Sequence, residues 1–224
     1  MVGTLRQLMR GLVVYYNMNN YTSWGLTEQR EYQNDLDYIY SHHTKDGYDN
    51  NLDEKVSKTT GVYGELTEHA VEHIMHELRD EFQNNRGVFY DLGSGTGKVV
   101  AHIALGSQLS KVCGIEFDTL RYDKSIKLIN SIKFPRAIPN IIHGDFFKHN
   151  YSDASIIYFD NIMWYDYLLK DKKLVMKLFK TVNKGTIIVS KHEIPYINGR
   201  KTSIKLNTSY NWSGGCITYY ENIS

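Results

Sequence analysis

The chain has 224 residues and a formal net charge of +1, with 42% hydrophobic and 23% charged residues. This describes an ordinary globular protein of one α/β domain with a small appendage, because no apolar run approaches the roughly 18 residues of a membrane helix. The first twenty residues lack the apolar core of a signal peptide, and two isolated cysteines argue against a zinc site or a disulfide framework.

The first sixty residues are polar and rich in tyrosine, with a helical pattern around 28–40 and a loop-like composition from 46 to 60. We therefore predict a polar, helical and loop-like N-terminal region over 1–60, and a second domain over 61–224. A helix follows Thr67, which is a good N-cap residue. Its apolar residues recur at helical spacing, as Ala70, Val71, Ile74, Met75 and Leu78.

From residue 88 onward, strand patterns alternate with helix patterns. The predicted strands lie at 88–90, 111–115, 140–142, 155–159 and 186–190, and the predicted helices at 99–105, 118–132 and 170–182. Such alternation predicts a mainly parallel, doubly wound sheet. The last stretch, 203–223, has the pattern of an antiparallel hairpin with a turn at 213–215.

The segment 88–98 reads as a strand, a glycine turn and a helix. Its three glycines let the backbone turn sharply and approach a ligand at the N-terminus of the helix. A P-loop is excluded, because Leu92 stands at the position of its first glycine and Val99 follows the lysine. A dinucleotide-binding loop is disfavoured, because the third glycine comes one residue early and Asp91 precedes the loop.

An acid before the glycine loop opposes a pyrophosphate but suits S-adenosylmethionine, which carries a cationic amino group and a sulfonium. Glu116 ends the second strand, where a carboxylate can accept both ribose hydroxyls. At the end of the third strand, Asp145 can accept from the adenine amino group and Phe146 can stack on the base. Because these strand ends share one crevice, we predict S-adenosylmethionine as the cofactor. The loop residues predicted to hold it are Asp91, Gly93, Ser94, Gly95, Gly97 and Lys98.

Four segments between about 53 and 223 resemble the Dot-one family (disruptor of telomeric silencing), the non-SET histone-lysine methyltransferases. Residues 62–65 (VYGE) resemble the loop that folds over the methionine part of the cofactor, and 90–97 (YDLGSGTG) resemble the DLGSGxG signature. Residues 155–164 (SIIYFDNIMW) are similar to the family's SVIFVNNFAF segment. Residues 211–214 (NWSG), followed by two tyrosines at 219–220, resemble its SWTG…SYY ending.

The resemblance implies a Rossmann-like class I methyltransferase with a mainly parallel seven-stranded sheet and an antiparallel C-terminal hairpin. It implies that 61–224 form the catalytic domain, which methylates a core lysine of histone H3 on the nucleosome, at chromatin in the nucleus. The implied cofactor contacts from the first segment are Val62, Tyr63, Gly64 and Glu65. The implied catalytic residues are Tyr158, Trp212 and Tyr219, which line a lysine channel, and Asp160 and Asn161 near the amine. Aromatic walls desolvate the ammonium and aim its stem.

The sequence departs from the family at several points. The paired asparagines of the family read Asp160-Asn161, Lys98 replaces a glutamine, and Leu66 replaces a threonine. A carboxylate at position 160 could hold the incoming ammonium, or it could stop the ammonium from losing its proton. The family generally carries a lysine-rich segment that grips nucleosomal DNA beyond its catalytic domain, and the chain, which stops at Ser224, does not show one.

A helical lysine stripe could contact DNA phosphates in place of that segment, although an ordinary solvated helix face is the simpler account. Its members, at i, i+4, i+7 and i+11, are Lys173, Lys177, Lys180 and Lys184. Histidines at 69, 73 and 76 share a helix face, but no HExxH motif is present and no metal site is predicted. Two alternative functions stay open: methylation of a non-histone protein or an RNA, and a catalytically weak module that binds chromatin or cofactor.

Overall fold

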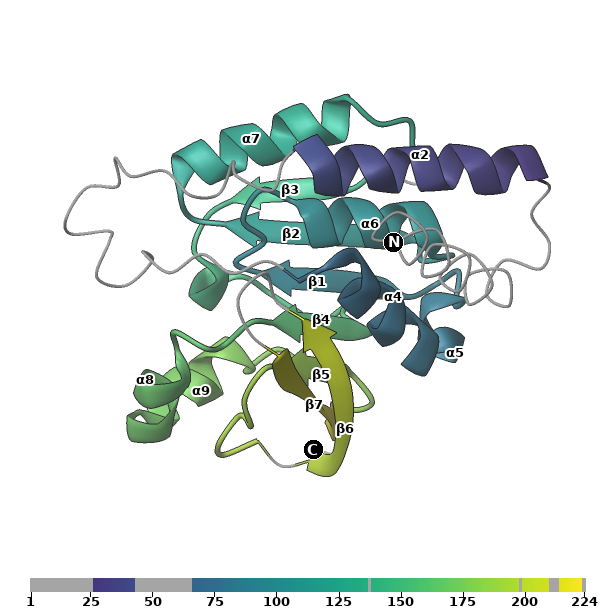
Figure 1. Ribbon diagram of the computed structural model, residues 1–224. Coiled ribbons are helices and arrows are strands. Elements are labelled where there is room, and N and C mark those ends of the chain that lie inside the picture. Colours follow the sequence, from purple (N-terminus) through teal and green to yellow (C-terminus); the bar gives the residue numbers. More distant parts are fainter. Residues whose placement is uncertain (1–25, 43–65, 137, 198, 210–213, 223–224) are drawn as a thin grey trace.

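The computed structural model describes residues 26–42, 66–136, 138–197, 199–209 and 214–222 (Figure 1). Seven strands form one sheet in the order β3-β2-β1-β4-β5-β7-β6. The strands are β1 Val88–Leu92, β2 Lys111–Glu116, β3 Asn140–His143, β4 Ile156–Phe159, β5 Ile187–Ser190, β6 Gly199–Ser209 and β7 Gly214–Asn222. The first five pair in parallel, and β7 runs antiparallel to both β5 and β6. The prediction of a Rossmann-like, mainly parallel sheet is therefore confirmed.

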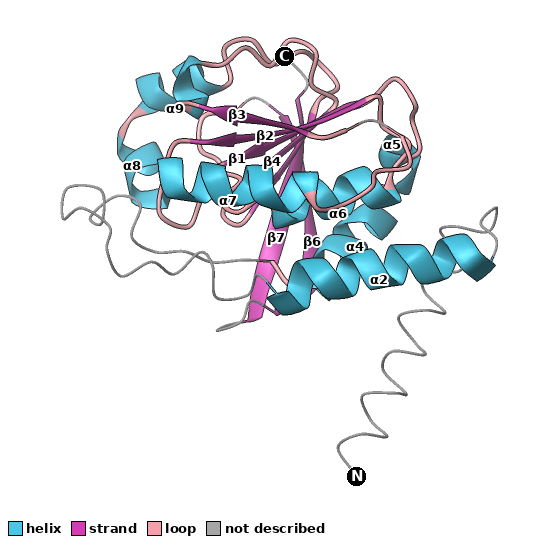
Figure 2. Cartoon of the chain, turned by 90° about the horizontal axis from the view of Figure 1, so that it is seen from above, coloured by secondary structure: helices cyan, strands magenta, loops and turns pink. Residues whose placement is uncertain are grey.

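Helices cover both faces of the sheet. They are α2 Leu26–His42, α4 Glu68–Glu77, α5 Arg79–Phe82, α6 Lys98–Gly106, α7 Thr119–Asn130, α8 Tyr165–Lys170 and α9 Lys172–Leu178, with a 3₁₀ turn η1 at Phe146–Lys148. Figure 2 shows α6 and α7 on one side of the strands and α8 and α9 on the other. In the part of the chain that the structure describes, no helix is long and apolar enough to cross a membrane.

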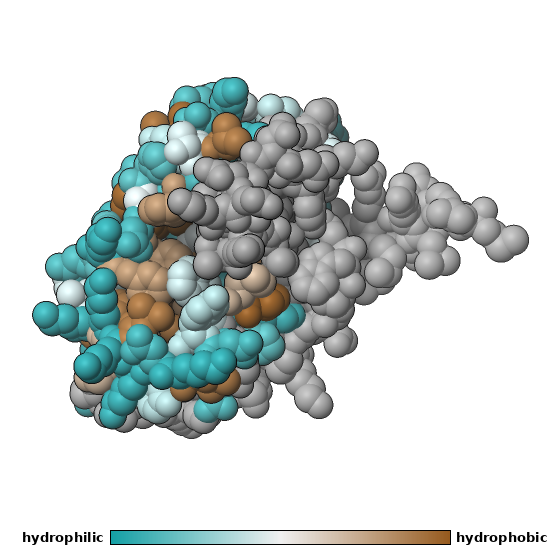
Figure 3. Space-filling model, turned by 90° about the vertical axis from the view of Figure 1, so that its left-hand side faces the viewer, coloured by the Kyte–Doolittle hydropathy of each residue, from teal (hydrophilic) through white to brown (hydrophobic). Residues whose placement is uncertain are grey.

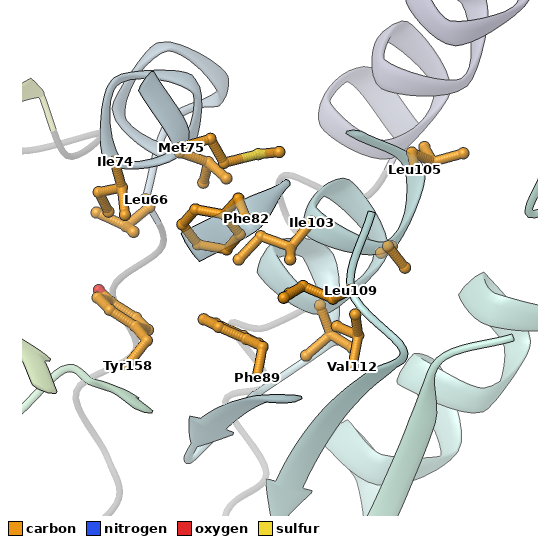
Figure 4. Close-up of a cluster of buried hydrophobic side chains, with 14 of the residues drawn as sticks. Leu66, Ile74, Met75, Phe82, Phe89, Ile103, Leu105, Leu109, Val112 and Tyr158 are labelled. Carbon is orange, nitrogen blue, oxygen red and sulfur yellow. The ribbon is translucent and has the colours of Figure 1, made fainter. Parts of the chain in front are cut away.

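Two hydrophobic clusters fill the spaces between the sheet and its helices. Phe89 of β1 joins the cluster under α4 and α6, whereas its neighbours Val88 and Tyr90 join the cluster under α9. Figure 4 shows the first cluster, in which Phe89 lies near Phe82 and Ile103. Every residue of β1 is buried, because a central parallel strand is covered on both faces.

Helix α2 belongs to the first cluster although it precedes the predicted domain boundary at residue 60. Tyr32, Leu36 and Ile39 recur at helical spacing and are buried in that cluster. The Tyr32 hydroxyl donates to the Glu72 carboxylate at 2.6 Å, and His102 Nε2 lies 2.9 Å from the same oxygen. These bonds join α2 to α4 and α6, so the helical part of the N-terminal region packs on the sheet domain. The division at residue 60 stays a prediction.

The helix predicted over 170–182 is shorter in the structure, where α9 spans Lys172–Leu178 and a separate helix, α8, precedes it, and this corrects the lysine stripe. Helix α8 ends at Lys170, and Asp171 starts α9 by accepting from the backbone N–H groups of Lys173 and Leu174 at 2.9 and 3.1 Å. An N-cap side chain of this kind interrupts a helix because it replaces the intrahelical acceptor. Since α9 ends at Leu178, the last two lysines of the predicted stripe, Lys180 and Lys184, lie beyond it.

Candidate active site

The strand order creates a topological switch point between β1 and β4. From β1 the chain moves outward to β2 and β3, and then returns to the other side of β1 to form β4. In open α/β sheets, ligands bind at the carboxyl ends of the strands beside such a point. Asp91 is the penultimate residue of β1, Glu116 ends β2 and Asp160 directly follows β4. Three carboxylates therefore lie at three neighbouring strand ends.

The strand arrows β1 to β3 of Figure 1 point toward this edge, and Figure 3 faces that side of the molecule. Apolar side chains gather there among polar ones on the described surface. Phe117, which follows Glu116, is 61% exposed, and Leu120 is also exposed. The edge thus combines acidic groups with apolar surface, as a site for a nucleoside with a cationic tail requires.

The glycine loop after β1 is pinned to the end of β2. Gly93, Gly95 and Gly97 all have positive φ angles, of 82°, 56° and 82°. The N–H groups of Gly93 and Ser94 donate to the Ile115 carbonyl at 2.9 and 3.0 Å. Because L-residues with a side chain rarely adopt this left-handed backbone, glycine is required at each of the three positions.

Ser94 is a candidate ligand donor in this loop. Its hydroxyl is buried, and it has no hydrogen-bond partner among the described residues. Gly114 of β2 makes room for it, since a Cβ atom at Gly114 would lie 2.5 Å from Ser94 Oγ. A buried hydroxyl without a partner costs free energy, so this one is suited to a ligand that supplies the missing hydrogen bond.

Glu116 is held in place by backbone donors on both sides. Its Oε2 accepts from the Gly95 N–H at 2.7 Å, and its Oε1 accepts from the Asp118 N–H at 2.8 Å. Burial raises the pKa of Glu116, and these two hydrogen bonds partly offset that rise. A carboxylate has about four acceptor sites, so the fixed oxygens can still receive two hydroxyl groups.

Asp91 is the most buried of the three carboxyls, with 3% of its surface exposed. Burial raises its pKa well above the ordinary value, and the negative charges of Glu116 and Asp160 raise the pKa further. A cationic ligand would relieve both effects, whereas a phosphate would add to the repulsion. The acidic groups, the orphaned Ser94 hydroxyl and the glycine loop therefore fit the cationic amino group and sulfonium of S-adenosylmethionine.

The end of β3 differs in part from the prediction. Asp145 caps η1 by accepting from the Phe147 N–H at 2.9 Å. The Phe146 ring is 8% exposed and packs edge-on against Phe159 and Trp164, with ring centroids 5.5 Å apart in both pairs. This packing makes Phe146 a core residue, and its stacking on an adenine stays a prediction that the arrangement does not favour. The exposed ring of Phe117, which directly follows Glu116, was not among the residues predicted to contact the cofactor.

Asp160 and Asn161 have different environments. Asn161 is fully buried, its amide donates to the His192 carbonyl at 2.8 Å, and its Oδ1 accepts from the His192 N–H at 2.7 Å. Asn161 therefore ties the end of β4 to the segment after β5, a partner that the sequence pattern did not reveal. Asp160 is half-buried, and its Oδ1 accepts from the Ile162 N–H at 3.3 Å.

The remaining predicted residues are placed only in part. Tyr158 is buried and pairs in register with Asp91 on one side and with Val189 on the other. Val189 in turn pairs with Tyr219, so these positions form one row across the sheet. Lys98 is buried at the first residue of α6. The predicted contacts at residues 62–65 and at Trp212 lie outside the described residues.

A family model described as "Histone methylation protein DOT1" matches residues 46–213. The chain belongs to this family. The resemblance inferred from the glycine loop and the flanking motifs is therefore confirmed, and the protein is a member of a methyltransferase family. Among the described residues of this DOT1 family member, no cluster of His, Cys, Asp and Glu could hold a metal ion.

Solved structures show the same fold. An RNA methyltransferase from Salinibacter ruber in complex with S-adenosyl-L-homocysteine has a TM-score of 0.56 and 22% identity, over 70% of this chain and 92% of that chain. Magnesium protoporphyrin IX methyltransferase from Synechocystis with bound S-adenosylmethionine has a TM-score of 0.53 and 14% identity, over 86% and 97%. A putative RNA methyltransferase from Pyrococcus horikoshii scores 0.52, also with 14% identity, over 85% and 96%. The fold is that of class I methyltransferases, in accord with the predicted cofactor.

Replacing Asp91 with asparagine is expected to stabilise the ligand-free protein at neutral pH by about 1 kcal/mol, or roughly 2–4 °C in melting temperature. Because the folded-state pKa of Asp91 is raised, stability falls as pH rises from the ordinary value of 3.8 through that raised pKa. Asparagine removes this loss, so the two proteins should differ at pH 7 and converge below pH 3.8. Thermal melts at several pH values test this.

The exposed Asp123 on α7 provides a matched control, because its replacement by asparagine removes one charge without relieving a buried one. We expect Asp123→Asn to melt within about 1 °C of the wild type, as exposed substitutions usually do. Equal melting temperatures of the Asp91→Asn and wild-type proteins at pH 7 would show that the buried charge of Asp91 does not destabilise the fold.

Proposed function

We propose that the protein is an S-adenosylmethionine-dependent lysine N-methyltransferase that modifies a core lysine of histone H3 in nucleosomes. The observation that carries the proposal is the grouping of Asp91, Glu116 and Asp160 at the switch point, around a glycine loop in which the buried Ser94 hydroxyl has no partner within the described part of the chain. Membership of the DOT1 family supports histone as the substrate.

Different residues would bind different parts of the cofactor and the substrate. Glu116 would accept the ribose hydroxyls, and Asp91 would face the cationic tail of the cofactor, which supplies an electrophilic methyl group. The target lysine would enter beside the end of β4, where Asp160 lies. Tyr158, Trp212 and Tyr219 are proposed to line its channel, since the family resemblance assigns them there and Tyr158 and Tyr219 share one row of the sheet.

The proposal also includes contact with nucleosomal DNA, through lysines that take no part in catalysis. Lys173 and Lys177 are exposed on α9, and Lys180 and Lys184 are exposed in the segment that follows. The sequence from 172 to 184 contains no carboxylate, so this segment carries a net positive charge, which suits a phosphate backbone. Chromatin and the nucleus are the proposed location, as this substrate requires.

The deciding experiment incubates the protein with methyl-labelled cofactor and nucleosomes, free histones or RNA in parallel. Label on a lysine in the core of histone H3 supports the proposal. Label on free histones or RNA alone would replace it with one of the alternative substrates. Absence of label from all three, with measurable binding of S-adenosylhomocysteine, would identify a binding module instead of an active enzyme.

A further inference from the structure

The proposed reaction requires the substrate lysine to lose a proton, and the residue directly after β4 is a carboxylic acid, Asp160. A lysine arrives as an ammonium, whose nitrogen has no lone pair until a proton leaves it. We propose that the Asp160 carboxylate receives this proton, so that the enzyme can take its substrate amine in the charged form. This inference rests on the proposed function, because it assumes that an amine is the methyl acceptor.

The position of Asp160 is the first argument. The switch point lies between β1 and β4, and Asp160 is the first residue after β4, next to the register pair of Leu92 and Phe159. Glu116 lies on the opposite side of β1, at the end of β2. A nucleoside held by Glu116 would have the end of β1 and then Asp160 as its next neighbours along the edge, so Asp160 is suited to lie near the reactive end.

The environments of the three carboxyls distinguish their roles. Asp91 is almost completely buried, so a proton that it received could not readily reach water. Both oxygens of Glu116 are already held by backbone donors. Asp160 is only half-buried, so it can contact an entering substrate and return a proton to solvent after each turnover. Of the three, Asp160 alone combines access with a position at the switch point.

Charge provides the second argument. Burial and the charge of Glu116 raise the pKa of Asp91 most, and the Asp160 carboxylate adds a smaller rise, so Asp160 lies close enough to Asp91 for their charges to interact. A proton taken up by Asp160 removes its contribution to this repulsion. Other titratable groups at the ends of these strands include Glu116 of β2, Asp145 after β3, and Lys191 and His192 directly after β5. The Asn161 amide holds the His192 backbone, so the segment beside Asp160 is fixed.

The step balances in atoms and charge. One N–H bond of the ammonium breaks, and its proton passes to an oxygen of Asp160. The freed nitrogen lone pair forms a bond to the methyl carbon, while the carbon–sulfur bond breaks and its electron pair stays on sulfur. The products are a methylated ammonium, a neutral carboxylic acid at Asp160 and S-adenosylhomocysteine. The carboxylic acid then loses its proton to water.

The first test uses sinefungin, a cofactor analogue with an amine in place of the reactive methyl group. Asp160→Asn keeps the size of the side chain and its acceptor for the Ile162 N–H while removing the charge. We expect this variant to bind sinefungin at least about tenfold more weakly, with S-adenosylhomocysteine affinity changed less than about twofold. Asp166→Asn, which removes an exposed charge on α8, should leave both affinities unchanged. Equal loss for both ligands, or no loss, would overturn the proposal.

The second test is the pH dependence of nucleosome methylation under saturating cofactor. Without an acceptor at position 160, the amine must lose its proton before it binds, so the rate of Asp160→Asn should rise about tenfold per pH unit from pH 7 to 9. The wild-type rate should be nearly flat over that range. Parallel profiles, or a faster Asp160→Asn enzyme at pH 7, would contradict the role of proton acceptor. A wild-type protein that labels no histone would instead contradict the proposed function, and the sinefungin comparison would still decide where Asp160 lies.

Discussion

Replacing Glu116 with alanine is expected to lower the affinity for S-adenosylhomocysteine by at least about a hundredfold, because two charge-assisted hydrogen bonds to the ribose hydroxyls are lost. The same change removes the acceptor for the Gly95 and Asp118 N–H groups, which lie 2.7 and 2.8 Å from the carboxylate oxygens. The glycine loop and the start of α7 would thus lose their common attachment. Isothermal titration with S-adenosylhomocysteine measures the effect.

Glu116→Gln is the informative companion variant. A glutamine keeps one oxygen acceptor and the shape of the side chain, so it should lose about tenfold, and alanine should lose more. Circular dichroism and thermal melts check that both variants are folded. An alanine variant that is folded and binds the ligand as tightly as the wild type would show that Glu116 takes no part in holding the nucleoside.

Gly97→Ala is expected to destabilise the fold by about 2–4 kcal/mol, which corresponds to a fall in melting temperature of roughly 6–12 °C. Gly97 has a φ angle of 82°, where an L-residue with a side chain is strained. A Cβ atom there would also lie 2.9 Å from the Cβ of Ser125 on α7. Since Ser125 is buried, it cannot move aside without displacing its helix. Differential scanning calorimetry gives the change.

Gly185→Ala separates the two causes of this destabilisation. Gly185 has a φ angle of 86°, yet a Cβ atom added there would meet nothing within 4 Å. Gly185→Ala should therefore lose only the stability that the strained backbone costs, about 1–2 kcal/mol. If both variants lose the same amount, the close approach of the glycine loop to α7 contributes nothing to stability.

Several features of the site were predictable because they are encoded in consecutive residues. The three glycines of residues 93–97 adopt a left-handed backbone that side chains disfavour, and Asp91 lies two positions before the first of them. In the sequence, a buried strand is recognised as a short apolar run, and a helix by apolar residues that recur about every 3.6 positions. The bounds of a helix were predicted less accurately. The helix expected over 170–182 begins only after its N-cap, Asp171, and already ends at Leu178.

Other features depend on contacts between residues that are far apart in the sequence. Asn161 is predicted to lie near the substrate amine, and the sequence did not reveal that its amide is buried and bonded to the backbone of His192, thirty-one positions later. Phe146 is predicted to stack on the base, and the sequence did not reveal that its ring packs edge-on against Phe159 and Trp164. Neither residue type distinguishes a core role from a ligand role, because the same side chain serves both.

The sequence alone thus determined the class of cofactor site, since the order of acid, glycine turn and helix is local and excludes phosphate-binding loops. Only the tertiary structure decided which carboxylates act together. The return of the chain to the far side of β1 brings Asp160 beside Asp91, although 69 positions separate them. Strand order is set by how whole helices and strands bury their apolar faces, and no short stretch of residues carries that information.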